Sequence, residues 1–162
     1  MQLKDKVAIV TGSSRGIGKG IAKAYGEEGA KVVVVARTDE DGGRLPGTIH
    51  QTVSEIEAAG GEALAVKCDV TEEEDVQALV KTVMDTYGRI DVLVNNAGIT
   101  LRTTIKDTET RRFQLIQRVN LLAPFLLSKY VLPVMEQQKS GSIINISSGA
   151  AGSRNGRGGS PY

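Results

Sequence analysis

Several residue classes are scarce in this chain, and each scarcity excludes a class of protein. The one cysteine, Cys68, has no partner for an internal disulfide, so we expect a reduced thiol packed at the end of an apolar run. Tryptophan is absent and aromatic residues make up 4% of the chain, which argues against stacking platforms for nucleic-acid bases. No apolar run approaches the roughly 18 residues of a membrane helix. The N-terminus also lacks the apolar core of a signal peptide.

Charge of either sign is not in excess, because 20 basic residues face 19 acidic ones and the net charge is +1. This balance gives no reason to expect nucleic acid or an anionic membrane as a partner. Cys68 and the single histidine, His50, lack neighbours with metal-ligand spacing, so we expect no metal site. A chain of 162 residues, 40% of them hydrophobic, can form one domain with a substantial core. Together with the reduced cysteine, these features lead us to expect a cytoplasmic protein.

The most informative stretch is an apolar strand, Val7–Thr11, that runs directly into a glycine-rich turn. The glycines of this turn are Gly12, Gly16 and Gly18, and a helical stretch follows at once. Glycines allow a tight turn and close approach of a ligand, while the N–H groups of the new helix point at an anion. The spacing departs from G-x-G-x-x-G and from the P-loop, in which a hydroxyl residue would follow the lysine. An ordinary tight strand-to-helix turn remains the alternative interpretation.

Strand-like and helix-like segments alternate along the whole chain. We expect strands at 7–11, 31–36, 63–67, 92–94 and 142–147, and helices at 16–28, 48–59, 71–87, 107–119 and 120–138. The third helix should begin with a capping box, because Thr71 is followed by three glutamates. Pro133 should kink or end a helix, so the last two helices form either two elements or one bent one.

Regular alternation of strands and helices predicts an α/β fold with a doubly wound parallel sheet and helices on both faces. In such sheets ligands bind at the carboxyl ends of the strands, near the point where the strand order reverses. We expect residues 143–146 to form an edge strand that exposes apolar surface.

Four motifs occur in order at the expected element boundaries. They are Thr11-Gly12-x-x-x-Gly16-x-Gly18, Asn95-Asn96-Ala97-Gly98, Asn120 and Asn145-Ile146-Ser147-Ser148. Together they make the chain similar to the short-chain dehydrogenases/reductases of the TGxxxGxG type. The resemblance implies a Rossmann-like fold in which residues 1–162 form one dinucleotide-binding domain, truncated at its C-terminal end so that the last strands are missing. It also implies that the full-length parent is a homodimer or homotetramer.

The resemblance assigns a set of cofactor-binding residues. Gly12, Ser14, Arg15, Gly16 and Gly18 would form the turn around the diphosphate, Ile17 would lie along the nicotinamide, Asp69 and Val70 would contact the adenine, and Asn95, Ala97 and Gly98 would line the ribose and stabilise the sheet centre. Two alternatives stay open. The two asparagines could form a simple strand-ending turn, and Asp69 could be an acid placed near the start of the helix at Thr71.

Catalysis in the family resembles general acid–base chemistry around a tyrosine. Ser148, which would bind the substrate carbonyl, lies 14 positions before Tyr162, which would transfer the proton, and Asn120 would position a water relay. Ser147 is the second candidate for the serine. A lysine four residues after the tyrosine would lower the pKa of the phenol, and the chain ends at Tyr162. We therefore expect this chain alone to be inactive or impaired.

Two further hypotheses concern the cofactor and the class of function. The second strand ends in Ala36-Arg37, where NAD-binding proteins place an acid for the ribose 2′-hydroxyl. Arg37 and Arg15 could instead bind a 2′-phosphate, so we predict NADP(H), with NAD(H) as the alternative if Asp39 reaches the ribose. The predicted reaction is hydride transfer between the nicotinamide and a carbonyl or secondary alcohol. A non-catalytic nucleotide-binding fragment or sensor is the competing function.

Overall fold

The computed structural model describes residues 1–37, 39–40, 46–101 and 103–148. Its centre is a five-stranded sheet in the order β3-β2-β1-β4-β5, with every neighbouring pair parallel. The strands are β1 (Val7–Thr11), β2 (Lys31–Ala36), β3 (Glu62–Lys67), β4 (Val92–Asn95) and β5 (Ser142–Asn145). The order reverses between β1 and β4, so the predicted doubly wound, Rossmann-like fold class is confirmed.

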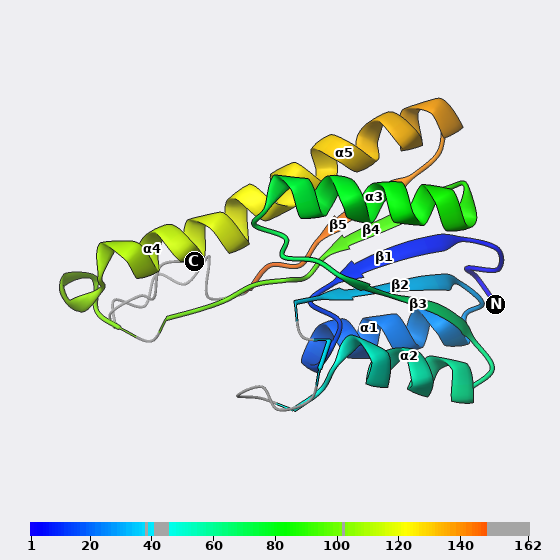
Figure 1. Cartoon of the computed structure of the whole chain (residues 1–162), viewed down its shortest axis with the longest axis horizontal. Helices are drawn as coiled ribbons and strands as arrows, with labels where there is room; N and C mark the ends of the chain where they lie inside the picture. Colours follow the sequence, from blue (N-terminus) through cyan, green and yellow to red (C-terminus); the bar gives the residue numbers. More distant parts are fainter. Residues whose placement is uncertain (38, 41–45, 102, 149–162) are drawn as a thin grey trace.

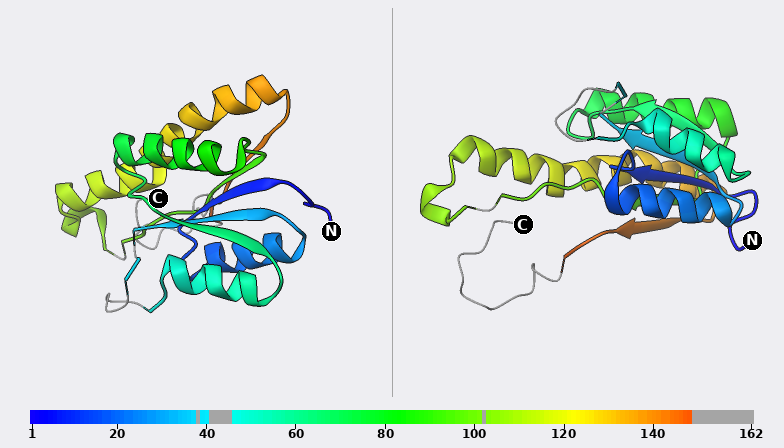
Figure 2. Two further views of the ribbon diagram at one scale, coloured as in Figure 1. Left: turned by 45° about the vertical axis from the view of Figure 1, so that its right-hand side comes forward. Right: turned by 90° about the horizontal axis from the view of Figure 1, so that it is seen from below.

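Helices cover both faces of this sheet (Figures 1 and 2). The helices are α1 (Gly16–Glu27), α2 (Ile49–Ala58), α3 (Glu73–Tyr87), α4 (Thr110–Gln117) and α5 (Ala123–Gln138). Helices α1 and α2 lie on one face, and α3 and α5 lie on the other (Figure 1). A short 3₁₀ turn, η1 (Ile105–Asp107), precedes α4. The helix and strand positions agree with the sequence-based expectations to within a few residues, apart from the differences described below.

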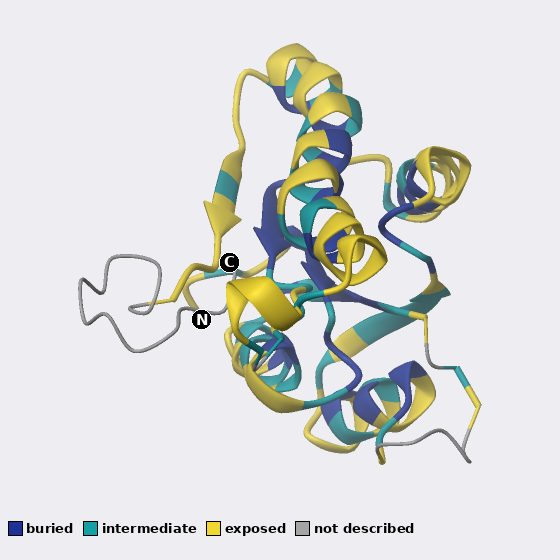
Figure 3. Cartoon of the chain, turned by 90° about the vertical axis from the view of Figure 1, so that its left-hand side faces the viewer, coloured by how far each residue is buried: buried dark blue, intermediate teal, exposed yellow. Residues whose placement is uncertain are grey.

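The core consists of two apolar layers because the central strands bury side chains on both faces. On the α3 and α5 side, Val7, Ile9, Val33, Val35 and Leu93 pack with Val76, Leu79, Val83, Leu127 and Val131. On the α1 and α2 side, Ala8, Val10, Val32, Val34, Val92 and Val94 pack with Ala22, Ile49 and Ile56. Figure 3 shows these buried strands between helices whose outer sides are exposed. Burial on both faces explains the continuous apolar sequence of the central strands.

Strand β5 lies at the edge of the sheet, as the sequence predicts. Ile143 packs against the core, whereas Ile144 and Ile146 are exposed. The strand ends at Asn145, two residues earlier than expected, although the Ile146 N–H still donates to the Asn95 carbonyl at 3.0 Å. An edge of this kind has unpaired backbone groups that can accept a further strand.

The last two expected helices, for which the sequence left open two elements or one bent one, form one continuous helical run, Thr110–Gln138, which contains both α4 and α5. Between them lies a π-helical turn, η2 (Arg118–Leu122), in which the Ala123 N–H donates to the Arg118 carbonyl. Pro124 accounts for the wider turn, since it lacks an N–H for the Asn120 carbonyl and its ring clashes with an ordinary α-helical carbonyl there. Pro133 lies inside α5 without ending it.

The same run is the one helix among the described residues that is long and apolar enough to cross a membrane, judged by length and composition alone. The sequence contains no uninterrupted apolar stretch of this length, and the run reaches it because the π turn joins α4 to α5. Leu127, Val131 and Met135 of this helix are buried against the sheet. The helix is therefore one wall of the domain core.

The predicted capping box at Thr71 is wrong. Helix α3 begins at Glu73, and its N-cap residue, Glu72, makes no side-chain cap hydrogen bond. The Thr71 hydroxyl and N–H both donate to Asp69 Oδ1, at 2.8 and 3.0 Å. An aspartate side chain can accept a hydrogen bond from the backbone N–H two residues later. Here Asp69 accepts in this way from Thr71, and the Thr71 hydroxyl donates to Asp69 and does not cap the helix.

A buried carboxylate joins the amino ends of β1 and β4. Asp91, whose side chain is 4% exposed, accepts from the Val7 N–H at 3.0 Å and from the Arg89 guanidinium at 2.6 and 2.7 Å. Lys6 Nζ lies 3.5 Å away. Burial acts to raise the pKa of Asp91, but the Arg89 and Val7 hydrogen bonds outweigh it and lower the pKa below its ordinary value.

We predict that Asp91→Asn lowers the free energy of unfolding at pH 7 by about 1–3 kcal/mol, because Val7 and Arg89 lose a charged acceptor. Since the folded-state pKa is lowered, this stabilisation is complete above pH 3.8 and is lost as the pH falls through the folded-state pKa. Urea unfolding at several pH values measures both effects. Asp85→Asn, which removes an exposed ion pair on α3, is the control. Equal losses in the two variants would contradict the prediction.

Candidate active site

The carboxyl ends of β1 and β4 are joined by one buried hydroxyl. Thr11 Oγ1 donates to the Val94 carbonyl at 3.2 Å and accepts from the N–H groups of Asn96 and Ala97 at 3.1 and 3.0 Å. Thr11 is completely buried. The hydroxyl thus makes three hydrogen bonds, its full capacity, and it determines where the segment after β4 lies relative to the glycine turn.

Asn96 reinforces this junction from the other strand. Its Nδ2 donates to the Thr11 carbonyl at 2.8 Å and to the Gly12 carbonyl at 3.3 Å. A Cβ on Gly18 would lie 2.4 Å from both the Gly12 oxygen and Asn96 Nδ2, and a Cβ on Gly12 would lie 2.9 Å from Ala97 Cα. Glycines at these two positions are therefore required by backbone packing between α1, β1 and β4.

The glycine turn is also attached to β2 and α2. Ser13 accepts from the Val35 N–H at 2.9 Å and donates to the Val10 carbonyl at 2.6 Å. Thr52 of α2 donates to the Ser13 carbonyl at 3.0 Å. The buried hydroxyls of Ser13 and Thr52 therefore attach the turn to β2 and α2 on its inner side.

The N-terminus of α1 has the features of an anion site. Its N-cap residue, Arg15, makes no side-chain cap hydrogen bond, in contrast to Thr48, which caps α2 by accepting from the Gln51 N–H. Gly16 has φ of +57° and nothing within 4 Å of where a Cβ would stand. The first turn of α1 thus has open space above N–H groups and the positive end of the helix dipole.

A cleft of about 460 Å³ lies beside this turn. It is lined by Gly12, Ser14, Arg15, Ala36, Arg37, Cys68, Asp69, Val70, Asn96, Ala97, Gly98, Ile99 and Val119. The structure thus brings together most of the predicted diphosphate and adenosine residues. Gly16, Ile17 and Gly18 are not among its lining residues in the described part of the chain, and Ile17 is 71% exposed on the first turn of α1.

The floor of this smaller cleft carries an ion pair and a neutral thiol. Arg37 Nη1 lies 3.6 Å from Asp69 Oδ2. Partial burial acts to raise the pKa of Asp69, but the Thr71 hydrogen bonds and the Arg37 charge lower it below its ordinary value. Burial, together with the nearby Asp75 and Asp69 carboxylates, raises the pKa of Cys68 to about 12, so its thiol is neutral and packed, as expected.

Asp39, the alternative ligand for a ribose hydroxyl, forms an ion pair with Lys67. Strand β2 ends at Ala36, as expected, and Arg37 follows it directly. Asp39 Oδ2 lies 3.0 Å from Lys67 Nζ at the end of β3. The hydrogen bond from Lys67 lowers the pKa of Asp39 below its ordinary value. Arg37, and not Asp39, therefore lines the smaller cleft in the described part of the chain.

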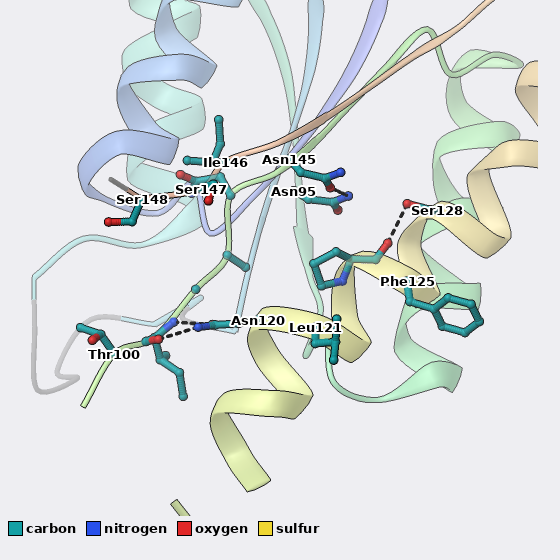
Figure 4. A pocket seen from close by; sticks show the side chains of 15 residues that line it. Asn95, Thr100, Asn120, Leu121, Phe125, Ser128, Asn145, Ile146, Ser147 and Ser148 are labelled. Atoms are coloured by element: carbon teal, nitrogen blue, oxygen red, sulfur yellow. Dashed lines mark hydrogen bonds between the residues drawn. The ribbon is translucent and has the colours of Figure 1, made fainter. Parts of the chain in front are cut away.

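A larger cleft of about 820 Å³ lies on the other side of the β4 carboxyl end. Its lining residues include Asn95, Asn96, Ala97, Gly98, Ile99, Thr100, Asn120, Leu121, Pro124, Phe125, Ser128, Asn145, Ile146, Ser147 and Ser148 (Figure 4). The segment 96–99 lines both clefts and forms their common wall. A ligand extended across the end of the sheet could therefore occupy both.

Asn120 lies in the π turn η2, inside the helical run Thr110–Gln138. Its Oδ1 accepts from the Ile99 N–H at 2.9 Å, and its Nδ2 donates to the Ile99 carbonyl at 2.8 Å (Figure 4). The side chain thus binds the segment after β4 through a pair of hydrogen bonds. Pro124 has no N–H to donate to the Asn120 carbonyl, which in a regular α-helix would accept from residue 124.

Ser148 lines the larger cleft, on the opposite side from Asn120 (Figure 4). Ser147 lines it too. Strand β5 ends at Asn145, so the two serines lie beyond it, where successive side chains need not point to opposite faces as they do in a strand. Tyr162 lies outside the described residues. The structure therefore brings Asn120 and Ser148 to one cleft, and the predicted role of Tyr162 stays a prediction.

Three residues of the site were not predicted as such from the sequence. Thr11, Ser13 and Asn96 join the glycine turn to β4 and β2. Their signal is a small or amide side chain directly after a buried strand, a position that favours hydrogen bonds to neighbouring backbone groups. That signal indicates a turn without indicating its partners, which lie up to 86 residues away in the chain.

We predict that Thr11→Val lowers the free energy of unfolding by about 2–4 kcal/mol, because it leaves the buried N–H groups of Asn96 and Ala97 without an acceptor. Thr11→Ser keeps the hydroxyl and loses one methyl group, so it should cost only about 1 kcal/mol. Chemical denaturation of the two variants measures the difference. Similar losses in both would show that the hydroxyl does not stabilise the junction.

Comparisons with known proteins agree with this geometry. Residues 6–162 match the family model described as short chain dehydrogenase. Hydroxysteroid dehydrogenase-like protein 2 of Xenopus tropicalis is 43% identical over 139 residues, which cover 86% of this chain and 33% of that protein. The chain thus spans about a third of the length of this curated relative.

Solved structures share the fold at substantial sequence identity. A metagenomic short-chain oxidoreductase in complex with NADP is 40% identical with a TM-score of 0.83, over 91% of this chain and 64% of that one. Hydroxysteroid dehydrogenase from Escherichia coli is 35% identical with a TM-score of 0.83, over 91% of this chain and 59% of that one. The family match extends over nearly the whole chain, and the chain belongs to the short-chain dehydrogenase/reductase family of oxidoreductases.

Proposed function

We propose that the full-length protein transfers a hydride between NADP(H) and a carbonyl or secondary alcohol. The observation that carries this proposal is the pair of clefts that meet at the segment 96–99, with the glycine turn beside one cleft and Ser148 in the other. One extended dinucleotide could lie across this wall, its adenosine half in the smaller cleft and its nicotinamide half in the larger.

The residues present fit such a cofactor. Gly16 leaves open space above the first turn of α1, whose N-cap residue makes no side-chain cap, and this arrangement suits a diphosphate. In the larger cleft Asn95 is buried, and its Oδ1 has no hydrogen-bond partner among the described residues. A buried acceptor of this kind indicates that a water or ligand donor binds beside it.

Preference for NADP(H) over NAD(H) is supported by charge. Arg15 and Arg37 both line the smaller cleft, and guanidinium groups bind phosphates through paired, charge-assisted hydrogen bonds. The carboxylate that could favour a ribose hydroxyl, Asp39, is paired with Lys67. The solved relative with bound NADP is consistent with this preference.

The chemistry follows from what the chain's own groups can do at the larger cleft. When bound, the nicotinamide supplies or accepts the hydride. The Ser148 hydroxyl would donate a hydrogen bond to the substrate oxygen, where negative charge develops during carbonyl reduction. Tyr162 would transfer the proton, and the backbone carbonyl of Asn120 would bind a water that relays it. Without a cation beside it, a phenol with a pKa near 10 is a weak proton donor at neutral pH.

The larger cleft favours an apolar substrate. Leu121 and Phe125 line it and are 67% and 62% exposed, and Ile146 lines the facing side. Ser128 lines it as well, but its hydroxyl donates to the Pro124 carbonyl at 2.7 Å. We propose a ketone or secondary alcohol with an apolar body, in keeping with the similarity to hydroxysteroid dehydrogenase from Escherichia coli.

We also propose that the full-length protein is a homodimer or homotetramer. Phe113, Leu115 and Leu132 are exposed along the helical run Thr110–Gln138 and do not line the larger cleft, and exposed apolar side chains of this kind are typical of an interface. Light scattering measures the mass in solution. We expect a dimer or tetramer, whereas a monomer at micromolar concentration would contradict the proposal.

We predict that Arg37→Asp in the full-length protein lowers the preference for NADPH over NADH by about 10- to 100-fold, because a carboxylate repels the 2′-phosphate that the guanidinium binds. The KM values for the two cofactors measure this preference. Arg111→Asp makes the same charge change on an exposed helical surface and should leave the preference unchanged. An unchanged preference in Arg37→Asp would refute the charge argument.

The competing function, a nucleotide-binding protein without catalysis, predicts a different result in the same assays. Such a protein would bind NADPH but oxidise none of it with any carbonyl substrate. Following NADPH absorbance with a panel of apolar ketones distinguishes the two.

A further inference from the structure

The π turn η2 contacts both halves of the site within three residues. Val119 lines the smaller cleft, Asn120 lines the larger one, and the Asn120 side chain binds the segment after β4. The first residue of the turn, Arg118, contacts the connection between β3 and α3. That connection contains Asp69 and Val70, which line the smaller cleft.

Arg118 makes two contacts with this connection through one nitrogen. Its Nη2 donates to Glu72 Oε1 at 2.8 Å and to the Thr71 carbonyl at 3.3 Å. Both charged side chains are about half exposed, at 49% and 57%, so the ion pair alone is weak. The contact with the backbone carbonyl matters more for geometry, because it determines where the main chain of the connection lies.

Thr71 is thus bound from two sides. Its N–H and hydroxyl donate to Asp69, while its carbonyl accepts from Arg118. Asp69 in turn pairs with Arg37. A continuous set of polar contacts therefore runs from Arg37, the proposed 2′-phosphate ligand, through Asp69 and Thr71 to the helix that carries Asn120.

We propose that Arg118 is a positioning residue for the adenosine half of the cofactor: it places the wall formed by Asp69 and Val70 at a set distance from the turn that carries Asn120. This inference rests on the proposed function and adds a residue to it. Arg118 is not among the residues that line either cleft, so it acts through Thr71 and Glu72.

The test measures binding of adenosine 2′,5′-bisphosphate, which contains the adenosine half alone, to the full-length protein by calorimetry. We expect Arg118→Gln to raise its Kd about fivefold. The KM for NADPH should rise by a larger factor than that by which kcat falls. A purely structural role would instead lower Tm and lower kcat without raising the KM.

Two further variants make the test specific. The variant Arg118→Lys keeps a cationic donor for the Thr71 carbonyl and Glu72, so it should recover part of the affinity that Arg118→Gln loses. Arg112→Gln is the matched control, because Arg112 lies on the same helical run and its partner, Glu109, belongs to that run's own N-terminus. If Arg118→Gln does not fold, Glu72→Gln removes the same ion pair from the other side.

Three results would overturn the inference. They are an unchanged Kd in Arg118→Gln and Glu72→Gln, an equal change in Arg112→Gln, and a fall in kcat without a rise in KM. If the unsubstituted protein binds neither NADPH nor the bisphosphate, the proposed function itself fails, and this inference fails with it.

Discussion

The hydroxyl of Thr11 is the interaction on which the rest of the site depends. It binds the carboxyl ends of the two central strands at the point where the strand order reverses. Without it the segment after β4 would keep only the Asn96 side-chain bonds to the Thr11 and Gly12 carbonyls, and the buried N–H groups of Asn96 and Ala97 would have no acceptor. The close backbone packing at Gly12 and Gly18 follows from the same junction, since Asn96 and Ala97 occupy the space that side chains there would need. The sheet thus positions an anion-binding turn and a polar wall beside each other.

From this junction the two clefts acquire different chemistry. The smaller one contains two arginines and a neutral thiol, whose burial keeps it from acting as a nucleophile or metal ligand. The larger one combines amide and hydroxyl groups with apolar walls. The smaller cleft thus suits the charged adenosine phosphate half of a dinucleotide. The larger cleft suits the nicotinamide half, whose reaction requires an oriented site that excludes water. The π turn borders both, and this explains why a local irregularity produced by Pro124 affects the whole site.

Much of the fold could be predicted from the sequence, because the central strands are continuous apolar runs and glycines mark their ends. The glycine turn and Arg37 after β2 were found by local pattern, whereas the place of Asn120 at the site was implied by the family resemblance. What local pattern could not predict were contacts between distant segments. The bond from Asn96 to Thr11 joins residues 85 positions apart, and that from Arg118 to Glu72 joins residues 46 apart. The capping box failed for a related reason, since Asp69 offered Thr71 a competing hydrogen bond. The π turn was not predicted, although Pro124, which explains it, lies in the sequence two residues after the turn.

The central claim is that one dinucleotide lies across the wall formed by residues 96–99. A crystal structure of the full-length protein grown with NADP⁺ tests it most directly. The account predicts the diphosphate over the first turn of α1, the 2′-phosphate against Arg37 and the nicotinamide in the cleft that contains Ser148. A nucleotide bound elsewhere, or a 2′-phosphate directed away from both Arg15 and Arg37, would contradict it.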